Sequence, residues 1–217
     1  MSDVVEKVVY LVRHGQSEAN AAAVFQGLHS PLSETGQNQA QKIAQRVQHL
    51  GCEALIASPL LRTKQTAEAI TAITGLTPEY SDLFIERIKP DRLNDKLHTD
   101  EVANALWHEW EHSLYTPNTR VEDGENFDDI LARADKALDF LQNRSEKSLV
   151  VVTHGYFLKT LTARVMLGSG MTPEAFKHFQ RHTHTQNTGL TVLHYKDTFE
   201  TPRAWHVWVY NDYAHLG

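Results

Sequence analysis

Short apolar runs alternate with stretches of helical periodicity along most of this chain, and this alternation constrains the fold more than any other feature. The strand-like runs are continuous and rich in β-branched residues, and they lie at 8–12, 54–57 and 149–153. Apolar residues recur at helical spacing at 40–47, 60–74, 127–141 and from Gly155 to about Gly168. Such alternation predicts an α/β fold, a three-layer α/β/α sandwich around a mainly parallel sheet.

The expected helices carry recognisable end signals. Gly51, Gly75 and Gly168 stand where helices should stop, and Asn126 with Asp129 three residues later predicts a helix cap. Two further strands are expected at 189–195 and 204–210. We expect one domain over residues 1–217.

The segment at about 87–124 interrupts the alternation and is expected to be an insertion. It contains Pro90 and a polar run, followed by one helical apolar face made of Ala103, Leu106, Trp107, Trp110 and Leu114. We expect this insertion to be helical and to pack over one edge of the sheet. Core packing is the simpler interpretation of the two tryptophans, and stacking on a ligand is the alternative.

Composition excludes several classes of function. The 217 residues carry 21 basic and 27 acidic side chains, so the net charge of −6 favours neither nucleic acid nor an anionic membrane as a partner. Cys52 is the only cysteine, which excludes an intramolecular disulfide. The chain shows neither a cationic leader nor a run of eighteen apolar residues, and we expect a cytoplasmic protein.

Two of the thirteen histidines occupy matching places. His14 and His154 each follow an expected strand and precede a glycine, Gly15 or Gly155. Ligands bind at the carboxyl ends of strands in open α/β sheets, and glycine lets the backbone approach a ligand closely. A matched pair of His-Gly turns therefore indicates a site.

Two arginines add the chemistry of an anion site. Arg13 directly precedes His14, and Arg62 follows the expected strand at 54–57. Arginine suits bidentate recognition of phosphate oxygens, although Arg62 alone would more often be a solvated surface residue. Together with the two histidines, these arginines indicate a phosphoryl-binding site.

These residues lie in four segments that, in order, resemble the histidine phosphatase superfamily, in its phosphoglycerate mutase-like branch. The segments read LVRHGQSEAN, QG…SPLSETGQNQA, SPLLRTKQTA and VVTHGYFLK. They run from residue 10 to about 160, and the strand from Gly189 fits the usual end of the family. The resemblance implies that His14 is the nucleophile that forms a phosphohistidine, while Arg13, Arg62 and His154 hold the transferring oxygens.

The resemblance also implies a general acid and further residues that line the phosphate or substrate. The segments place Ser17, Asn20, Gln26, Gly27 and Gly155 at positions that line the phosphate or substrate, with a turn or cap role as the alternative. No metal or other cofactor is implied. The matching acid is Glu86, after a strand-like Leu83-Phe84-Ile85, with Asp82 as the fallback. Glu86 could instead be a solvated carboxylate that pairs with Arg87, because the family's usual glycine- and tryptophan-containing stretch is replaced by RIKPDRLNDK.

That replaced stretch is locally basic. It holds Arg87, Lys89, Arg92 and Lys96, which could bind a second anionic group or form a solvated face. The insertion would then cover the active-site edge. The pairs His182/His184 and His108/His112 have spacings that could suit a metal, but they lack a third ligand nearby. We predict no metal site, and a strand or loop around His182.

Three functions follow in order of preference. The first is a metal-independent phosphomonoester phosphatase acting on a small phosphorylated metabolite through His14. The second is a phosphoglycerate-type phosphomutase, disfavoured because NTGLTVLHY lacks a glycine-proline context and the insertion differs from that of glycolytic mutases. The third is a non-catalytic phospholigand-binding protein, disfavoured by the intact set of histidines and arginines. Neither the substrate nor the oligomeric state follows from the sequence.

Overall fold

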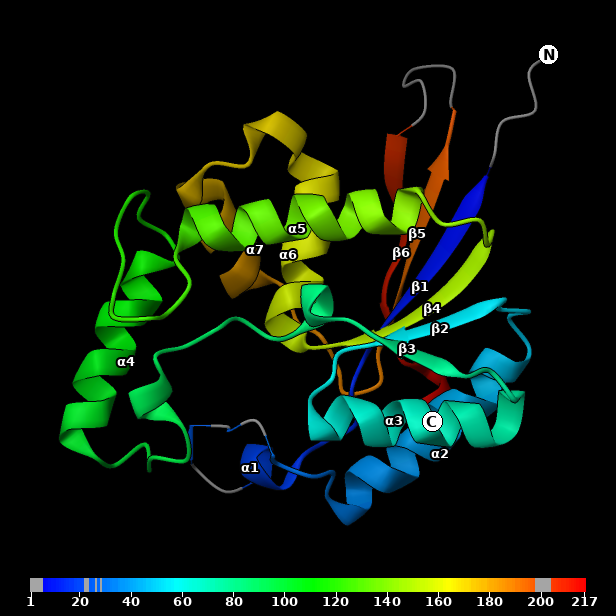
Figure 1. The fold of residues 1–217 in the computed structure, drawn as a ribbon, viewed down its shortest axis with the longest axis horizontal. Helices are drawn as coiled ribbons and strands as arrows, with labels where there is room; N and C mark the ends of the chain where they lie inside the picture. The colour runs from blue at the N-terminus through cyan, green and yellow to red at the C-terminus, as the bar shows by residue number, and fades with distance from the viewer. Residues whose placement is uncertain (1–5, 22–23, 26, 28, 198–203) are drawn as a thin grey trace.

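A computed structural model of the chain describes residues 6–21, 24–25, 27, 29–197 and 204–217. Its sheet has six strands in the order β3-β2-β4-β1-β5-β6 (Figure 1). The strands are β1 (Lys7–Arg13), β2 (Ala54–Ala57), β3 (Pro78–Tyr80), β4 (Ser148–Thr153), β5 (Leu190–Lys196) and β6 (Ala204–Asp212). β1, β2, β3 and β4 pair in parallel, whereas β5 is antiparallel to both of its neighbours, so the prediction of a mainly parallel sheet is confirmed.

Helices cover both faces of this sheet, as predicted. The α-helices are α1 (Glu18–Ala21), α2 (Glu34–Gln48), α3 (Leu61–Thr74), α4 (Glu101–Ser113), α5 (Phe127–Gln142), α6 (Gly155–Leu167) and α7 (Pro173–His182). The 3-10 helices are η1 (Asp82–Phe84), η2 (Asp91–Leu93), η3 (Gly168–Gly170) and η4 (Ala214–Leu216). Figure 1 shows α2 and α3 on one face of the sheet and α5 and α6 on the other.

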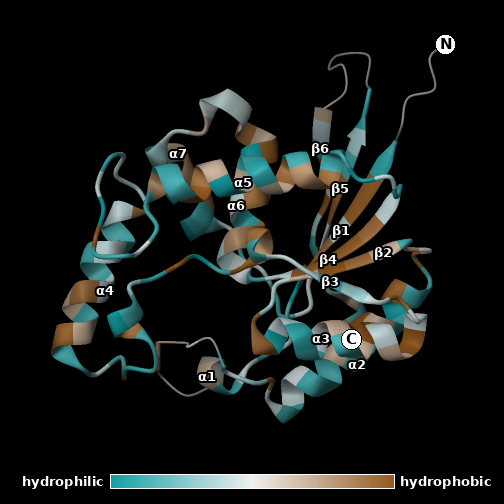
Figure 2. Ribbon diagram, viewed as in Figure 1, coloured by the Kyte–Doolittle hydropathy of each residue, from teal (hydrophilic) through white to brown (hydrophobic). Residues whose placement is uncertain are grey.

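Burial on both faces explains why the central strands read as continuous apolar runs. Figure 2 shows these strands as hydrophobic and the covering helices as mixed. Successive residues of a strand point to opposite faces. Thus Val151 packs in the cluster that contains α5 and α6 residues, whereas Val150 and Val152 pack in the cluster with Ile43 of α2 and Ile70 of α3.

The predicted helix ends at Gly75, Gly168 and Asn126 are confirmed, whereas α2 ends at Gln48 with His49 as its C-cap, before Gly51 is reached. Gly75 ends α3 at a φ of 76° and Gly168 ends α6 at a φ of 53°, conformations in which glycine carries no penalty. Asn126 and Asp129 cap α5 reciprocally. No helix of the described residues is long and apolar enough to cross a membrane.

Two local expectations need correction. Leu83-Phe84-Ile85 does not form the expected strand. β3 is an edge strand of the sheet, and η1 follows it in the chain. The Ser81 hydroxyl caps η1 by accepting a hydrogen bond from the Leu83 N–H at 3.3 Å. His182 does not lie in a strand or loop but ends α7, whose Thr172 cap and Pro173 at the first turn are helix-start signals.

The insertion builds a small core of its own. Phe25, Leu93, Trp110, Leu114 and Val121 form a buried cluster separate from the two clusters at the sheet. Figure 1 places α4, within the insertion, on the side toward which the parallel strands point. The insertion therefore faces the edge of the sheet at which the histidines lie.

Candidate active site

The ends of three parallel strands bring the candidate residues together. Arg13 of β1 is in register with Thr153 of β4, and Ala57 of β2 is in register with Val152. The next residue of each strand, respectively His14, His154 and Ser58, therefore emerges at one edge of the sheet. The two imidazole centroids lie 5.1 Å apart, in an edge-to-face arrangement.

His14 is held in a defined tautomer. Its side chain is buried, and its Nδ1 lies 2.6 Å from the carbonyl oxygen of Gly15. A carbonyl oxygen only accepts hydrogen bonds, so Nδ1 carries the proton and Nε2 of the neutral ring keeps its lone pair. Arg62 Nε donates to that Nε2 at 3.3 Å. The lone pair therefore faces a cation, as a nucleophile beside a bound phosphoryl group would.

Electrostatics keep both imidazoles neutral. Burial, followed by the positive charges of Arg62 and Arg13, lowers the pKa of His14 well below its usual value. Burial and the charge of Arg62 likewise lower the pKa of His154 well below the usual range. A neutral His14 is the form that can attack phosphorus.

His154 is oriented by one neighbour and leaves its other nitrogen available. Its Nε2 lies 2.8 Å from the hydroxyl oxygen of Ser58, and its buried Nδ1 has no hydrogen-bond partner among the described residues. An unsatisfied buried nitrogen is costly in the absence of a ligand. His154 is therefore placed to bind a polar group in the site.

The two arginines are also fixed, with Arg62 buried and Arg13 half-buried. Arg13 donates through Nη1 to the carbonyl oxygen of Thr185 at 2.6 Å, and its buried Nε has no partner among the described residues. Arg62 donates through Nη1 to the carbonyl oxygen of Gly27 at 3.2 Å. Burial lowers the pKa of Arg13, and it lowers that of Arg62 to about 10, so Arg62 remains charged at neutral pH.

Glycines permit the close packing of the loop that follows β1. A Cβ on Gly15 would collide with the carbonyl oxygen of Gly36 at the start of α2, and one on Gly36 would collide with the carbonyl oxygen of Gln16. At Gly155, a Cβ would lie 3.1 Å from Arg13 Nε and from the Thr185 hydroxyl. Gly15 thus allows the backbone after β1 to contact the start of α2, and Gly155 allows the start of α6 to contact Arg13.

Glu86 lies at the N-terminus of α6. Its carboxylate accepts hydrogen bonds from the N–H groups of Phe157 at 3.1 Å and Tyr156 at 3.4 Å, and from that of Arg87 at 3.2 Å. Unpaired N–H groups and the helix dipole favour a negative charge there. Glu86 also shares the lining of a cavity with Arg62, so the structure brings it to the site of the histidines and arginines.

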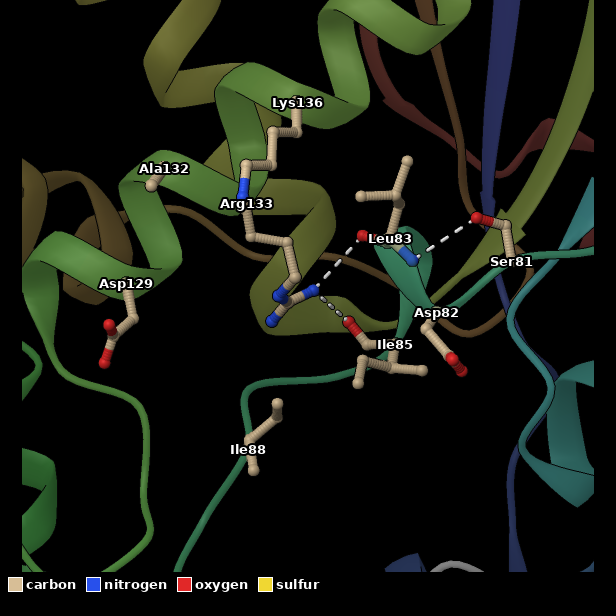
Figure 3. A pocket seen from close by; sticks show the side chains of 9 residues that line it. All are labelled: Ser81, Asp82, Leu83, Ile85, Ile88, Asp129, Ala132, Arg133 and Lys136. Carbon is tan, nitrogen blue, oxygen red and sulfur yellow. Dashed lines mark hydrogen bonds between the residues drawn. The ribbon is translucent and has the colours of Figure 1, made fainter.

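A buried ion pair fixes the segment that carries Glu86. Arg133 of α5 donates to the carbonyl oxygens of Leu83, Ile85 and Glu86 at 3.2, 2.9 and 3.2 Å. The same guanidinium forms two hydrogen bonds, of 2.7 and 2.8 Å, with the Glu125 carboxylate. Figure 3 shows Arg133 reaching from α5 toward Leu83 and Ile85. The position of Glu86 therefore depends on α5.

Asp82, the alternative acid, belongs to a different hollow. It is exposed and lines a hollow of about 440 Å³ between α5 and residues 81–88, together with Arg133 and Lys136 (Figure 3). Arg62, which lines the other cavity together with Glu86, does not line that hollow. The geometry favours Glu86 over Asp82.

The basic stretch divides into two halves. Arg87 and Lys89 line the cavity beside Arg62, which has a volume of about 540 Å³. Burial and the charge of Arg62 lower the pKa of Lys89 to about 8. In contrast, Arg92 is exposed and pairs with Glu122 at 2.6 Å, and Lys96 is exposed.

The alternative interpretation, in which Glu86 pairs with Arg87, is wrong, because the two side chains form no ion pair with each other. The nearest carboxylate to the Arg87 guanidinium is that of Glu111, at 3.7 Å.

Of the two tryptophans, Trp110 is fully buried as expected and donates to the carbonyl oxygen of Glu125 at 2.9 Å. Trp107 is half-buried and also lines the cavity, as Trp110 does.

The further residues that were expected to line the phosphate or substrate lie in different surroundings. Ser17 is fully buried beside the site loop and pairs with Leu32 in an isolated bridge. Gly27 is buried, accepts from Arg62 and lines the cavity. Asn20 belongs to α1, but its side chain lies outside the described residues, as does all of Gln26.

The structure adds residues that sequence reasoning missed. Ser58 contacts His154, and its place directly after a strand was an available signal. Asn187 donates to the carbonyl oxygen of His14 at 3.0 Å, across 173 positions of sequence, and no local pattern indicates it. Among the described residues, no group of three or more His, Cys, Asp or Glu is placed to hold a metal ion.

Comparison with known proteins gives a consistent family. The model of the histidine phosphatase superfamily (branch 1) matches residues 9–207. A "Probable phosphoglycerate mutase GpmB" of Photorhabdus laumondii subsp. laumondii is 32% identical over 216 residues, which cover 96% of this chain and 94% of the relative. The Escherichia coli protein of the same name is 28% identical with the same coverage.

Solved structures share the fold. Bacillus stearothermophilus YhfR is 26% identical with a TM-score of 0.78, covering 97% of this chain and 100% of that chain. A putative alpha-ribazole-5'-P phosphatase from Escherichia coli has a TM-score of 0.77 at 20% identity, covering 95% of this chain and 96% of its own. A mycobacterial glucosyl-3-phosphoglycerate phosphatase in complex with VO3 has a TM-score of 0.74 at 23% identity, covering 95% and 100%.

Proposed function

Because the chain belongs to the histidine phosphatase superfamily, we propose that it hydrolyses a small phosphomonoester through a phosphohistidine on His14, without a metal. One observation carries this proposal. A neutral, buried imidazole with its lone pair on Nε2 lies among Arg13, Arg62 and His154, and the Glu86 carboxylate lines a cavity together with Arg62.

In the first step, Nε2 of His14 attacks phosphorus and the bond from phosphorus to the ester oxygen breaks. Arg13, Arg62 and His154 bind the equatorial oxygens, whose negative charge they stabilise as the phosphoryl group moves. Glu86 delivers a proton to the departing oxygen, which leaves as an alcohol.

In the second step, Glu86 acts in the opposite direction. As a carboxylate it takes a proton from a water molecule, whose oxygen attacks phosphorus while the phosphorus–nitrogen bond breaks. Hydrogen bonds from three backbone N–H groups hold the Glu86 carboxylate in position for this step. Inorganic phosphate is released, His14 is neutral again, and Glu86 is protonated for the next cycle.

A phosphomutase is the second candidate, because the curated relatives are named as probable phosphoglycerate mutases. Hydrolysis is favoured by the solved structures that are named as phosphatases. The solvent-exposed Ile88, Asp91 and His98 also line the cavity, so it is open to the water that hydrolysis requires.

The test is turnover of a broad phosphomonoester panel in the presence of chelator, with and without a bisphosphate primer. We expect release of inorganic phosphate that needs neither metal nor primer. Isomerisation that depends on the primer and releases no phosphate would establish the mutase instead. A pure His14→Ala variant that kept full activity would contradict the mechanism.

A further inference from the structure

The cavity beside the phosphoryl-binding residues is large enough to select the leaving group. Arg62, Gly27 and Glu86 line it on the side of the sheet, and Phe25 and Trp107 line it on the side of the insertion. Its volume of about 540 Å³ lies in the range of small-molecule sites. A substrate with its phosphorus at His14 would place its esterified group here.

Aromatic rings form one wall of the cavity, in which Trp107 and His98 of the insertion pack against Phe25 from the segment after α1. Phe25 stacks on Trp107 with ring centroids 4.7 Å apart and planes 28° apart, and His98 lies 4.4 Å from the same phenylalanine ring. Side chains already stacked on one another lose little conformational freedom when a ligand arrives. Such a wall favours a flat, apolar group over a small hydroxylated one.

Arg87 lines this cavity, and its guanidinium donates no hydrogen bond to the described residues. The guanidinium carbon lies 4.4 Å from the ring centroid of Tyr156, 4.7 Å from that of Trp107 and 5.0 Å from that of Trp110. Cation–π contacts engage the charge but accept none of the N–H donors that point outward in the guanidinium plane.

The Arg87 side chain is mostly buried, but none of its nitrogens is among the buried side-chain atoms that lack a hydrogen-bond partner. The Arg87 side chain is only 16% exposed, and its nearest carboxylate, Glu111, lies 3.7 Å away on a side chain that is 41% exposed. The guanidinium forms no hydrogen bond with the described residues, so its donors remain accessible to solvent or to a ligand. A largely buried arginine in this state suits an anionic ligand.

We propose that the site prefers phosphomonoesters whose leaving group joins a flat apolar body to a second anionic group, which Arg87 binds. This inference rests on the proposed function, because it assigns the leaving group of that same reaction. It also separates the basic stretch into Arg87, which faces the ligand, and Arg92, which is solvated and paired with Glu122.

Two aryl phosphates that differ in one charge test the inference on the unaltered protein. The anionic ester is 4-carboxyphenyl phosphate, and its neutral counterpart is 4-carbamoylphenyl phosphate. We expect the anionic ester to have the lower KM, by about tenfold or more, as one charge-assisted contact allows. Arg87→Gln should reduce kcat/KM for the carboxylate about tenfold more than for the amide, mainly through KM. Arg92→Gln is the matched control and should change neither value.

The aromatic wall is tested separately with Trp107→Leu. It should raise the KM of both aryl esters several-fold more than that of glycerol 3-phosphate. Aryl esters with KM values within twofold of each other in the unaltered protein, or an equal loss on both in Arg87→Gln, would overturn the inference and leave the phosphatase intact. Failure of every ester to release phosphate would instead overturn the proposed function.

Discussion

Arg133 should control proton delivery by Glu86 without touching the substrate. Its guanidinium makes three hydrogen bonds to the carbonyl oxygens of residues 83, 85 and 86 and two to the carboxylate of Glu125, which also accepts from the Ile88 N–H at 2.8 Å. The pair is buried, with side chains 11% and 9% exposed. Removing the arginine therefore leaves a buried carboxylate without its cation.

The size of the effect on stability follows from that burial. Arg133→Met should lower the free energy of unfolding by about 3–5 kcal/mol, the usual result of breaking one side of a buried ion pair. The double variant Arg133→Met/Glu125→Leu should recover much of that loss, because it also removes the unpaired charge. Urea denaturation of the two variants measures both values.

The effect on catalysis depends on the leaving group. p-Nitrophenolate departs without a proton, whereas an alkoxide requires one from the acid. If Arg133 positions Glu86, the double variant should lose at least about tenfold more kcat on an alkyl phosphate than on p-nitrophenyl phosphate, although its stability has recovered. Equal losses on both substrates would refute the positioning role and leave Arg133 as a purely structural residue.

Three further outcomes are expected. Glu86→Gln should lower kcat on alkyl phosphates by about 10²–10⁴, with a much smaller loss on p-nitrophenyl phosphate, whereas Asp82→Asn should leave both rates unchanged. Burial lowers the pKa of His154, so below about pH 6.5 the unfolded chain binds a proton that the folded chain does not, and the free energy of unfolding falls. His154→Gln should reduce that pH dependence by up to about 1.4 kcal/mol per pH unit in urea titrations. Gly36→Ala forces a Cβ onto a backbone carbonyl oxygen and should cost about 1–3 kcal/mol in the same assay, whereas Gly170→Ala, with no atom near its Cβ, should change it little.

Much of the fold could be predicted because local patterns and tertiary structure agree. The central strands are buried on both faces and therefore read as apolar runs, while Gly75, Gly168 and Asn126 set helix ends through their own backbone or side-chain chemistry. The Leu83-Phe84-Ile85 run failed as a strand because a short apolar run is equally compatible with a buried turn.

The site was predictable only in part, for a related reason. His14 and His154 follow strands whose register is set by the sheet, so their meeting could be inferred from topology. Asn187 and Arg133 reach the site segments from distant parts of the chain, and nothing in their neighbouring residues indicates those contacts. The difference between Arg87 and Arg92 likewise depends on how the insertion packs.

The phosphohistidine itself is the most direct test of the account. Rapid quench of the protein with a ³²P-labelled phosphomonoester, followed by peptide mapping, should find one labelled residue, His14, with an acid-labile and base-stable bond. The label should appear before inorganic phosphate and decay as phosphate is released, and Glu86→Gln should slow its decay. Turnover without any label on His14, or label on a carboxylate or serine instead, would contradict the proposed mechanism.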